Sequence, residues 1–168
     1  MNRFVRSILV VLLASMLVSC AGVTSTPADT NKMIEPGDMI GDFLVTTGDE
    51  EDVVYAFDQD CVKQGDKENY SCKSTVGTKV NITTGIYDLS GKLDEKWSRF
   101  TYQLFIEGRP VNLQSFPPID VRHPVVSRIR FWNVAVTTSK PGSITTRDVG
   151  VIDGESVEST TTYTFSAP

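Results

Sequence analysis

The chain has 168 residues, of which 40% are hydrophobic and 22% charged, and its formal net charge is −5. This composition is ordinary for a globular protein and excludes wholesale disorder, collagen-like repeats and an architecture of many membrane spans. The chain has 21 acidic and 16 basic side chains. This excess of negative charge argues against nucleic acid as a partner, because such a chain repels phosphate backbones. A single histidine, His123, excludes a zinc site built on two histidines.

The first residues are typical of a secretion signal. Arg3 and Arg6 supply positive charge, and an apolar run over 8–18 follows them. This run is much shorter than the roughly 20 residues that a membrane-spanning helix needs. The sequence therefore predicts a signal peptide over 1–19, and its removal leaves 14 basic and 21 acidic side chains in the mature chain.

The signal ends in Leu17, Val18, Ser19 and Cys20, which resemble the lipobox of bacterial lipoprotein precursors. The resemblance implies cleavage before Cys20, a thioether-linked diacylglycerol on its sulfur, and acylation, for example by palmitate, of the new amine. Two or three acyl chains hold a protein on a membrane, because each buried CH₂ contributes about 0.8 kcal/mol. Ala21 stands where the family has an acidic residue for inner-membrane retention, which favours the outer membrane or the cell surface. The alternative is an ordinary signal peptide with a chance cysteine.

The mature chain divides into a tether and one folded domain. Residues 20–36 are rich in Thr, Ser, Ala, Asp and Pro and offer little apolar surface to bury, so they predict a flexible tether after the lipidated Cys20. The folded domain is expected over 37–168.

The two remaining cysteines, Cys61 and Cys72, form an even pair on the oxidising side of the membrane. A turn-rich centre separates them, so we expect a hairpin with a structural cross-strand disulfide. A redox-active pair is the less favoured interpretation, because the Cys-x-x-Cys spacing is absent.

Hydrophobic residues alternate with polar ones along most of the domain, as in Phe100, Tyr102 and Leu104, and this period of two predicts half-buried strands. Only Leu93 to Trp97 has helical character, over about one turn. The strands are expected at 42–47, 53–60, 69–75, 79–86, 98–106, 110–113, 129–138, 143–151 and 156–166.

Turn residues connect the last three predicted strands into a meander. Pro141 and Gly142 are typical of the central positions of a type II turn, and Asp153 with Gly154 of a two-residue hairpin. Together the features predict an all-β fold, a single antiparallel β-sandwich of about eight to nine strands. The pattern resembles the immunoglobulin-like sandwiches of bacterial secreted and lipid-anchored proteins. That likeness is general, so no functional residue is carried over from it.

The acidic segment over 49–60 suggests a site for a structural calcium ion, the one cofactor that the sequence indicates. Calcium prefers carboxylate oxygens on loops, but the spacing of these acids does not fit an EF-hand, and exposed acids are usually only solvated. The candidate ligands are Asp49, Glu50, Asp52, Asp58 and Asp60.

The connection over 114–127 is long and contains three prolines, and arginines in and after it form the one basic patch on an acidic chain. Such a patch suits a carboxylate, phosphate or sugar-acid ligand. The favoured alternative is that Phe116 and Ile119 cover the core while the arginines pair with nearby acids. The candidate ligand-binding residues of this patch are Arg122, His123, Arg128 and Arg130.

Phe131 and Trp132 are adjacent aromatic residues in a predicted strand, so their side chains must point to opposite faces of the sheet. One of them is therefore expected on the outer side, unless a bulge or an edge covers it. With Arg128 and Arg130, this surface is the candidate site for a polysaccharide.

These features predict a lipid-anchored protein of the cell envelope that acts as a non-catalytic binding module for polysaccharide or peptidoglycan. Its partners are then the membrane, through the lipid at Cys20, and a polymer. The alternative is a protein-interaction or assembly subunit of an envelope complex. Catalysis is not expected, because the sequence has no Gly-x-Ser-x-Gly elbow, phosphate-binding loop or dinucleotide fingerprint.

Overall fold

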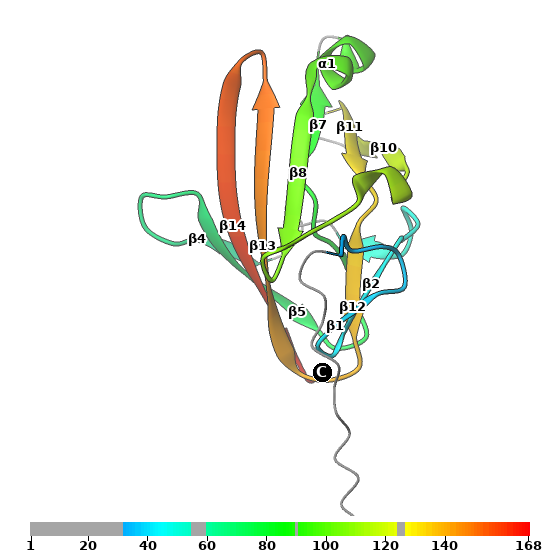
Figure 1. Cartoon of the computed structure of the whole chain (residues 1–168), viewed down its shortest axis with the longest axis vertical. Coiled ribbons are helices and arrows are strands. Elements are labelled where there is room, and N and C mark those ends of the chain that lie inside the picture. Colours follow the sequence, from blue (N-terminus) through cyan, green and yellow to red (C-terminus); the bar gives the residue numbers. More distant parts are fainter. Residues whose placement is uncertain (1–31, 55–59, 90, 124–126) are drawn as a thin grey trace, which may run out of the picture.

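The computed structural model describes residues 32–54, 60–89, 91–123 and 127–168. The predicted signal peptide, Cys20 and most of the tether lie outside these residues. The described part consists of β-strands, one short α-helix and one 3₁₀ turn (Figure 1). No helix in these ranges is long and apolar enough to cross a membrane.

A six-stranded sheet forms one layer of the fold. Its centre is the long hairpin of β13 and β14, joined by Asp153 and Gly154 with φ values of 53° and 86°, which confirms the predicted two-residue hairpin. The strands in spatial order are β4 (Cys61–Lys63), β5 (Asn69–Thr75), β14 (Glu155–Ser166), β13 (Gly142–Ile152), β8 (Thr101–Ile106) and β9 (Arg109–Pro110).

Two smaller sheets lie end to end and form the layer opposite the six-stranded sheet (Figure 1). The five-stranded sheet contains β1 (Met39–Ile40), β2 (Phe43–Thr46), β12 (Ala135–Thr138), β6 (Lys79–Asn81) and β3 (Val53–Val54). The three-stranded sheet contains β10 (Pro118–His123), β11 (Ser127–Trp132) and β7 (Gly85–Asp88). Where one sheet gives way to the other, at 82–84 and 133–134, the Ile82 amide donates a hydrogen bond of 3.0 Å to the Val134 carbonyl.

The main hydrophobic core lies between the layers. Inward side chains such as Leu104, Ile144 and Phe165 from the six-stranded sheet meet Val45 and Val136 from the five-stranded sheet, and all five are almost fully buried. A smaller cluster contains Val121, Ile129 and Phe131 of the three-stranded sheet together with Ala135 of β12.

Most of the predicted strands are present, with boundaries that local structure shifts. Of the strand expected at 53–60, only β3 and residue 60 lie within the described residues. The strand expected at 110–113 is wrong over most of its length, because β9 ends at Pro110 and a 3₁₀ turn begins at Leu113. The strand expected at 69–75 coincides with β5, and the one expected at 156–166 is β14. The helix α1 (Leu93–Arg99) is longer than expected, so the strand predicted from residue 98 begins only at Thr101. The strands expected at 79–86 and 129–138 are each interrupted where the chain passes from one small sheet to the other.

The expected purely antiparallel sandwich is wrong in one respect, because two strand pairs are parallel. β14 pairs with β5, and β3 pairs with β6, in parallel register. Parallel neighbours cannot be joined by a tight turn. The chain leaves β5 for the opposite layer, and β14 returns from the far end of the sequence to lie beside it.

The predicted meander of the last three strands is also wrong. β12 belongs to the five-stranded sheet, whereas β13 and β14 belong to the six-stranded one, so the chain changes layers between β12 and β13. Gly142 has no positive φ and is the first residue of β13, which contradicts the expected type II turn with Pro141. Gly142 instead packs under the ring of Phe43, where an added Cβ would lie 3.5 Å from the ring.

The long connection expected over 114–127 contains a strand. β10 begins at Pro118, where a proline is tolerated, and pairs with β11. The interpretation that Phe116 and Ile119 cover the core is confirmed. Phe116 is fully buried in the main core, and Ile119 packs against the smaller cluster.

The predicted disulfide is present. Cys61 on β4 lies opposite Cys72 on β5 in antiparallel register, and their sulfur atoms are bonded. Cys72 is buried in the main core, so the bond attaches the edge strand β4 to a strand that is anchored in the domain.

We expect the double substitution Cys61→Ala with Cys72→Ala to lower the free energy of unfolding by about 3 kcal/mol, because the uncrosslinked chain gains loop entropy when it unfolds. Urea unfolding of the oxidised wild type and the variant measures the difference. Reduction of the wild type should produce a similar loss. Equal stability of the oxidised wild type and the variant would contradict a stabilising role for the disulfide.

Candidate functional site

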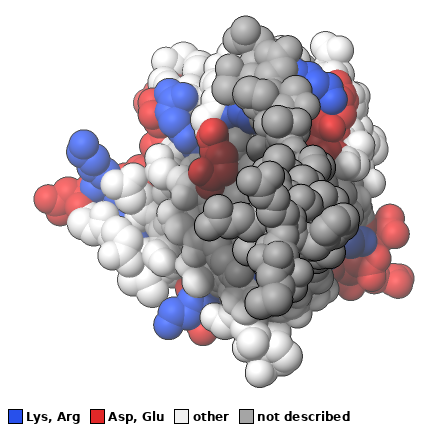
Figure 2. Space-filling view, turned by 60° about the horizontal axis from the view of Figure 1, so that its bottom comes forward, with Lys and Arg blue, Asp and Glu red and all other residues white. Residues whose placement is uncertain are grey.

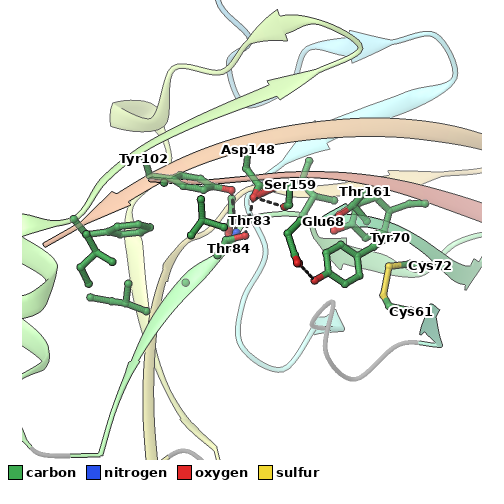
Figure 3. A pocket seen from close by; sticks show the side chains of 18 residues that line it. Cys61, Glu68, Tyr70, Cys72, Thr83, Thr84, Tyr102, Asp148, Ser159 and Thr161 are labelled. Atoms are coloured by element: carbon green, nitrogen blue, oxygen red, sulfur yellow. Dashed lines mark hydrogen bonds between the residues drawn. A yellow bond between two sulfur atoms is a disulfide. The ribbon is translucent and has the colours of Figure 1, made fainter. Parts of the chain in front are cut away.

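A cavity of about 490 Å³ lies between the layers, beside the break that separates β6 from β7 (Figure 3). Most of its wall is apolar, and a few polar groups converge in it. Its described lining residues are Cys61, Glu68, Tyr70, Cys72, Ile82, Thr83, Thr84, Gly85, Ile86, Phe100, Tyr102, Asp148, Gly150, Ile152, Val157, Ser159, Thr161 and Tyr163.

Strand periodicity directs the polar groups into the cavity. Asp148 on β13 shares its face with Ile144 and Ile152, because alternate residues of a strand point the same way. Its register partner on β14 is Ser159, which therefore points into the cavity as well. Thr84 approaches from the opposite layer, through the connection between β6 and β7.

Asp148 is the central polar group of the site. Its side chain accepts hydrogen bonds from the hydroxyls of Thr84, at 3.1 Å, and Ser159, at 2.8 Å, both at Oδ2 (Figure 3). The residue is only 7% exposed, and burial raises the pKa of its carboxyl. Within the described part of the chain, no Lys or Arg forms an ion pair with it.

Thr84 also connects the layers through its backbone. Its amide donates a hydrogen bond of 2.9 Å to the phenol oxygen of Tyr102, which lies on β8. Tyr102 and Tyr163 are buried, and this burial raises the pKa of both phenols, with the nearby Asp148 charge acting in the same direction. Both side chains are therefore neutral hydrogen-bonding groups over the ordinary pH range.

A second polar group lies near the disulfide. Glu68 accepts hydrogen bonds from the Lys63 ammonium and the Tyr70 hydroxyl, and the bond from Lys63 lowers the pKa of the Glu68 carboxyl most. Glu68 thus has a positive partner, in contrast to Asp148.

The predicted basic patch is largely neutralised by acids, as the favoured interpretation expected. Arg130 forms ion pairs with Asp120, at 2.8 Å from Nη2, and with Asp94 of α1, at 2.7 Å. Arg128 also binds Asp120, and the hydrogen bond from Arg130 lowers the pKa of that carboxyl most. On the face shown in Figure 2, basic side chains lie next to acidic ones at several places and do not form one patch.

Arg122 and His123 belong to β10 and are not brought to the cavity. The side chain of Arg122 is exposed. The side chain of His123 lies outside the described part of the structure.

The expectation that Phe131 or Trp132 has an open outer side fails. Phe131 is 2% exposed, in the smaller core cluster. On the opposite face, Trp132 is half-buried because α1 covers it. Its ring stacks on Tyr102 at 5.2 Å and contacts Trp97 of α1 at 4.4 Å, and the Arg130 guanidinium lies 5.8 Å from the Trp97 ring. The expected polysaccharide platform is therefore occupied by contacts within the chain.

The predicted calcium ligands are only partly described. Asp58 lies outside the described residues, whereas Asp49, Glu50, Asp52 and Asp60 lie within them. Asp52 forms an ion pair with Lys79 at 3.3 Å, and in the described ranges no group of three potential ligand side chains could hold a metal ion. A calcium site that includes Asp58 stays a prediction.

Asp148 is not among the site residues predicted from the sequence. The sequence does contain a signal for this site. The alternating pattern of the strand places Asp148 on the same inward face as Ile144, Thr146 and Ile152. A charged residue among inward positions marks a buried polar site. Thr84 and Ser159 had no comparable signal, since isolated Ser and Thr residues are common in strands and loops.

Comparison with known proteins identifies no family. No protein-family model matches the chain, and no curated protein matches it. One solved structure that matches is described as "Structure of PbICP-C in complex with falcipain-2", with 14% identity and a TM-score of 0.31. The match covers 69% of this chain and 98% of that chain. A likeness of this size carries no argument about fold or function.

Asp148→Asn should leave the free energy of unfolding at neutral pH unchanged or raise it, within about 1 kcal/mol, because an amide still accepts the two hydroxyl hydrogen bonds. The raised pKa means that Asp148 stabilises the fold fully below its unfolded pKa, and that this contribution is lost as the pH rises through the folded pKa. Urea unfolding across this range should therefore show the wild type losing stability relative to the variant as the pH rises.

The matched control is Asp120→Asn, which should have the opposite pH dependence. The pKa of Asp120 is lowered in the fold, so its contribution is present above the unfolded pKa and disappears as the pH falls through the folded pKa. For Asp148→Asn, a loss of about 3 kcal/mol in the free energy of unfolding at neutral pH would indicate that a buried ion pair had been broken. Such a loss would contradict the assignment of Asp148 as a buried carboxylate without a positive partner in the described part of the chain.

Proposed function

We propose that this chain is a lipid-anchored protein of the cell envelope whose domain binds a small, mostly apolar ligand without changing it chemically. The observation that carries the proposal is the cavity, whose volume of about 490 Å³ lies within the usual range for small-molecule sites. An apolar wall with a few converging polar groups is typical of such sites, because the wall supplies affinity and the polar groups supply orientation.

Contacts within the chain favour the cavity as the binding site, in preference to the predicted polysaccharide surface. The guanidinium of Arg130 is held by two carboxylates, and the ring of Trp132 is packed under α1. A polymer would have to displace these contacts. The cavity requires no such displacement, and two of its lining residues, Thr84 and Val157, are exposed and offer access from solvent.

The polar groups of the cavity suit binding better than catalysis. The hydroxyl of Ser159 donates to the Asp148 carboxylate, a weak base, and no histidine lies among the described lining residues. The lipid anchor at Cys20 and the envelope location are part of the proposal and rest on the lipobox. The two facing layers are compatible with a variant of the immunoglobulin-like sandwich that contains two parallel strand pairs.

We expect Cys20→Ala to abolish lipid attachment, because no thiol then remains to accept the diacylglycerol. Metabolic labelling with a palmitate analogue and the mass of the isolated chain measure this. Cys61→Ala is the control and should keep the label. Labelling that persists in Cys20→Ala would contradict the lipoprotein assignment.

A ligand of the cavity should raise the unfolding temperature of the full chain by several degrees when present at about a hundred times its dissociation constant. A panel of small amphipathic compounds and short oligosaccharides provides the probes. Ser159→Phe fills the cavity and should abolish the shift, whereas Ser156→Phe places the same ring on an exposed position of β14 and should keep it. The cavity is not the binding site if no probe shifts the wild type, or if Ser159→Phe keeps the full shift.

A further inference from the structure

The charges around the cavity are unbalanced. Asp148 and Glu68 are the charged side chains among its described lining residues, and both are acidic. Glu68 is neutralised by Lys63, whereas Asp148 has two hydroxyl partners and no positive one in the described part of the chain. Low-dielectric walls strengthen the field of such a charge, so the cavity attracts cations.

The hydrogen-bonding capacity of Asp148 is incomplete. Among the described residues, only the hydroxyls of Thr84 and Ser159 bond to its carboxylate, and both bond to Oδ2. A carboxylate offers about four acceptor positions. The acceptor positions on Oδ1 are therefore available to a hydrogen-bond donor from the ligand. The two hydroxyls hold the carboxylate in a fixed orientation beside the cavity (Figure 3).

The walls around this carboxylate suit a cation attached to an apolar body. Tyr102 and Phe100 present aromatic rings to the cavity, and such rings attract an ammonium group through their quadrupoles. Ile86, Ile152 and Val157 supply aliphatic surface further along the wall. The cavity thus combines one acidic group, aromatic neighbours and an apolar remainder.

We propose that the Asp148 carboxylate binds the ammonium group of a small amphipathic amine, whose apolar body lies against the aliphatic and aromatic walls of the cavity. This inference rests on the proposed function, since it names the ligand class of the same site. A buried carboxylate without a positive partner is costly in a folded protein. The ammonium group of the ligand supplies the missing charge.

The proposal makes binding depend on pH through one group. The titratable side chains that face Asp148 are Tyr102 on β8, Tyr163 on β14 and Tyr70 on β5, with Glu68 also on the wall. The three phenols stay neutral because their pKa values are raised, and the pKa of Glu68 is lowered. Amine binding should therefore weaken as the pH falls through the pKa of Asp148 and protonates it.

The test uses three probes of similar shape, 3-phenylpropylamine, 3-phenylpropan-1-ol and 3-phenylpropanoate. Each is titrated calorimetrically into the full chain in a nonionic detergent at about pH 7.5, with a titration into detergent alone subtracted. We expect the amine to bind at least about tenfold more tightly than the alcohol, and the carboxylate to bind most weakly.

Asp148→Asn should remove the preference for the amine while keeping the affinity for the alcohol, because the amide preserves shape and hydrogen bonds. Asp120→Asn, outside the cavity, should keep the preference. Equal binding of amine and alcohol by the wild type, or a preference that survives Asp148→Asn, overturns the inference but leaves the proposed function intact. Failure of all three probes to bind overturns both the inference and the proposed cavity site.

Discussion

The two layers of this domain meet in two different ways, and the position of the cavity follows this difference. At one end, apolar side chains such as Val136 and Ile144 fill the interior. Beside the break between β6 and β7, the layers are instead joined by hydrogen bonds from Thr84 to Tyr102 and Asp148. The cavity lies at this junction, and Thr84, Tyr102 and Asp148 are among its lining residues.

A cluster of aromatic rings supports the cavity from behind. Tyr102 forms part of the cavity wall and also stacks on Trp132, which is in turn covered by Trp97 from α1. The ion pair between Arg130 and Asp94 attaches α1 to β11. Trp132 and Arg130, which by sequence suggested a ligand surface, therefore support a wall of the cavity.

Local patterns predicted the parts of the structure that depend on neighbouring residues. The hairpin at Asp153 and Gly154 needs two adjacent residues with positive φ, and the disulfide between Cys61 and Cys72 spans a short hairpin. The predicted type II turn at Gly142 is wrong. At this residue the chain passes from one layer to the other, and the Phe43 ring packs against it. The strand β10 was missed because the prolines in and beside it are typical of loops, although β10 itself contains only Pro118, at its first position.

The sequence by itself determined the class of fold, the main strands and the disulfide, because alternation, turn residues and cysteine spacing act over short distances along the chain. The tertiary structure alone decided the pairing of β5 with β14 and the meeting of Thr84, Asp148 and Ser159. Thr84 and Asp148 are 64 positions apart in the chain, and their contact follows from strand order and register across two layers. No local pattern encodes such a contact, so the candidate site emerges only in the folded domain.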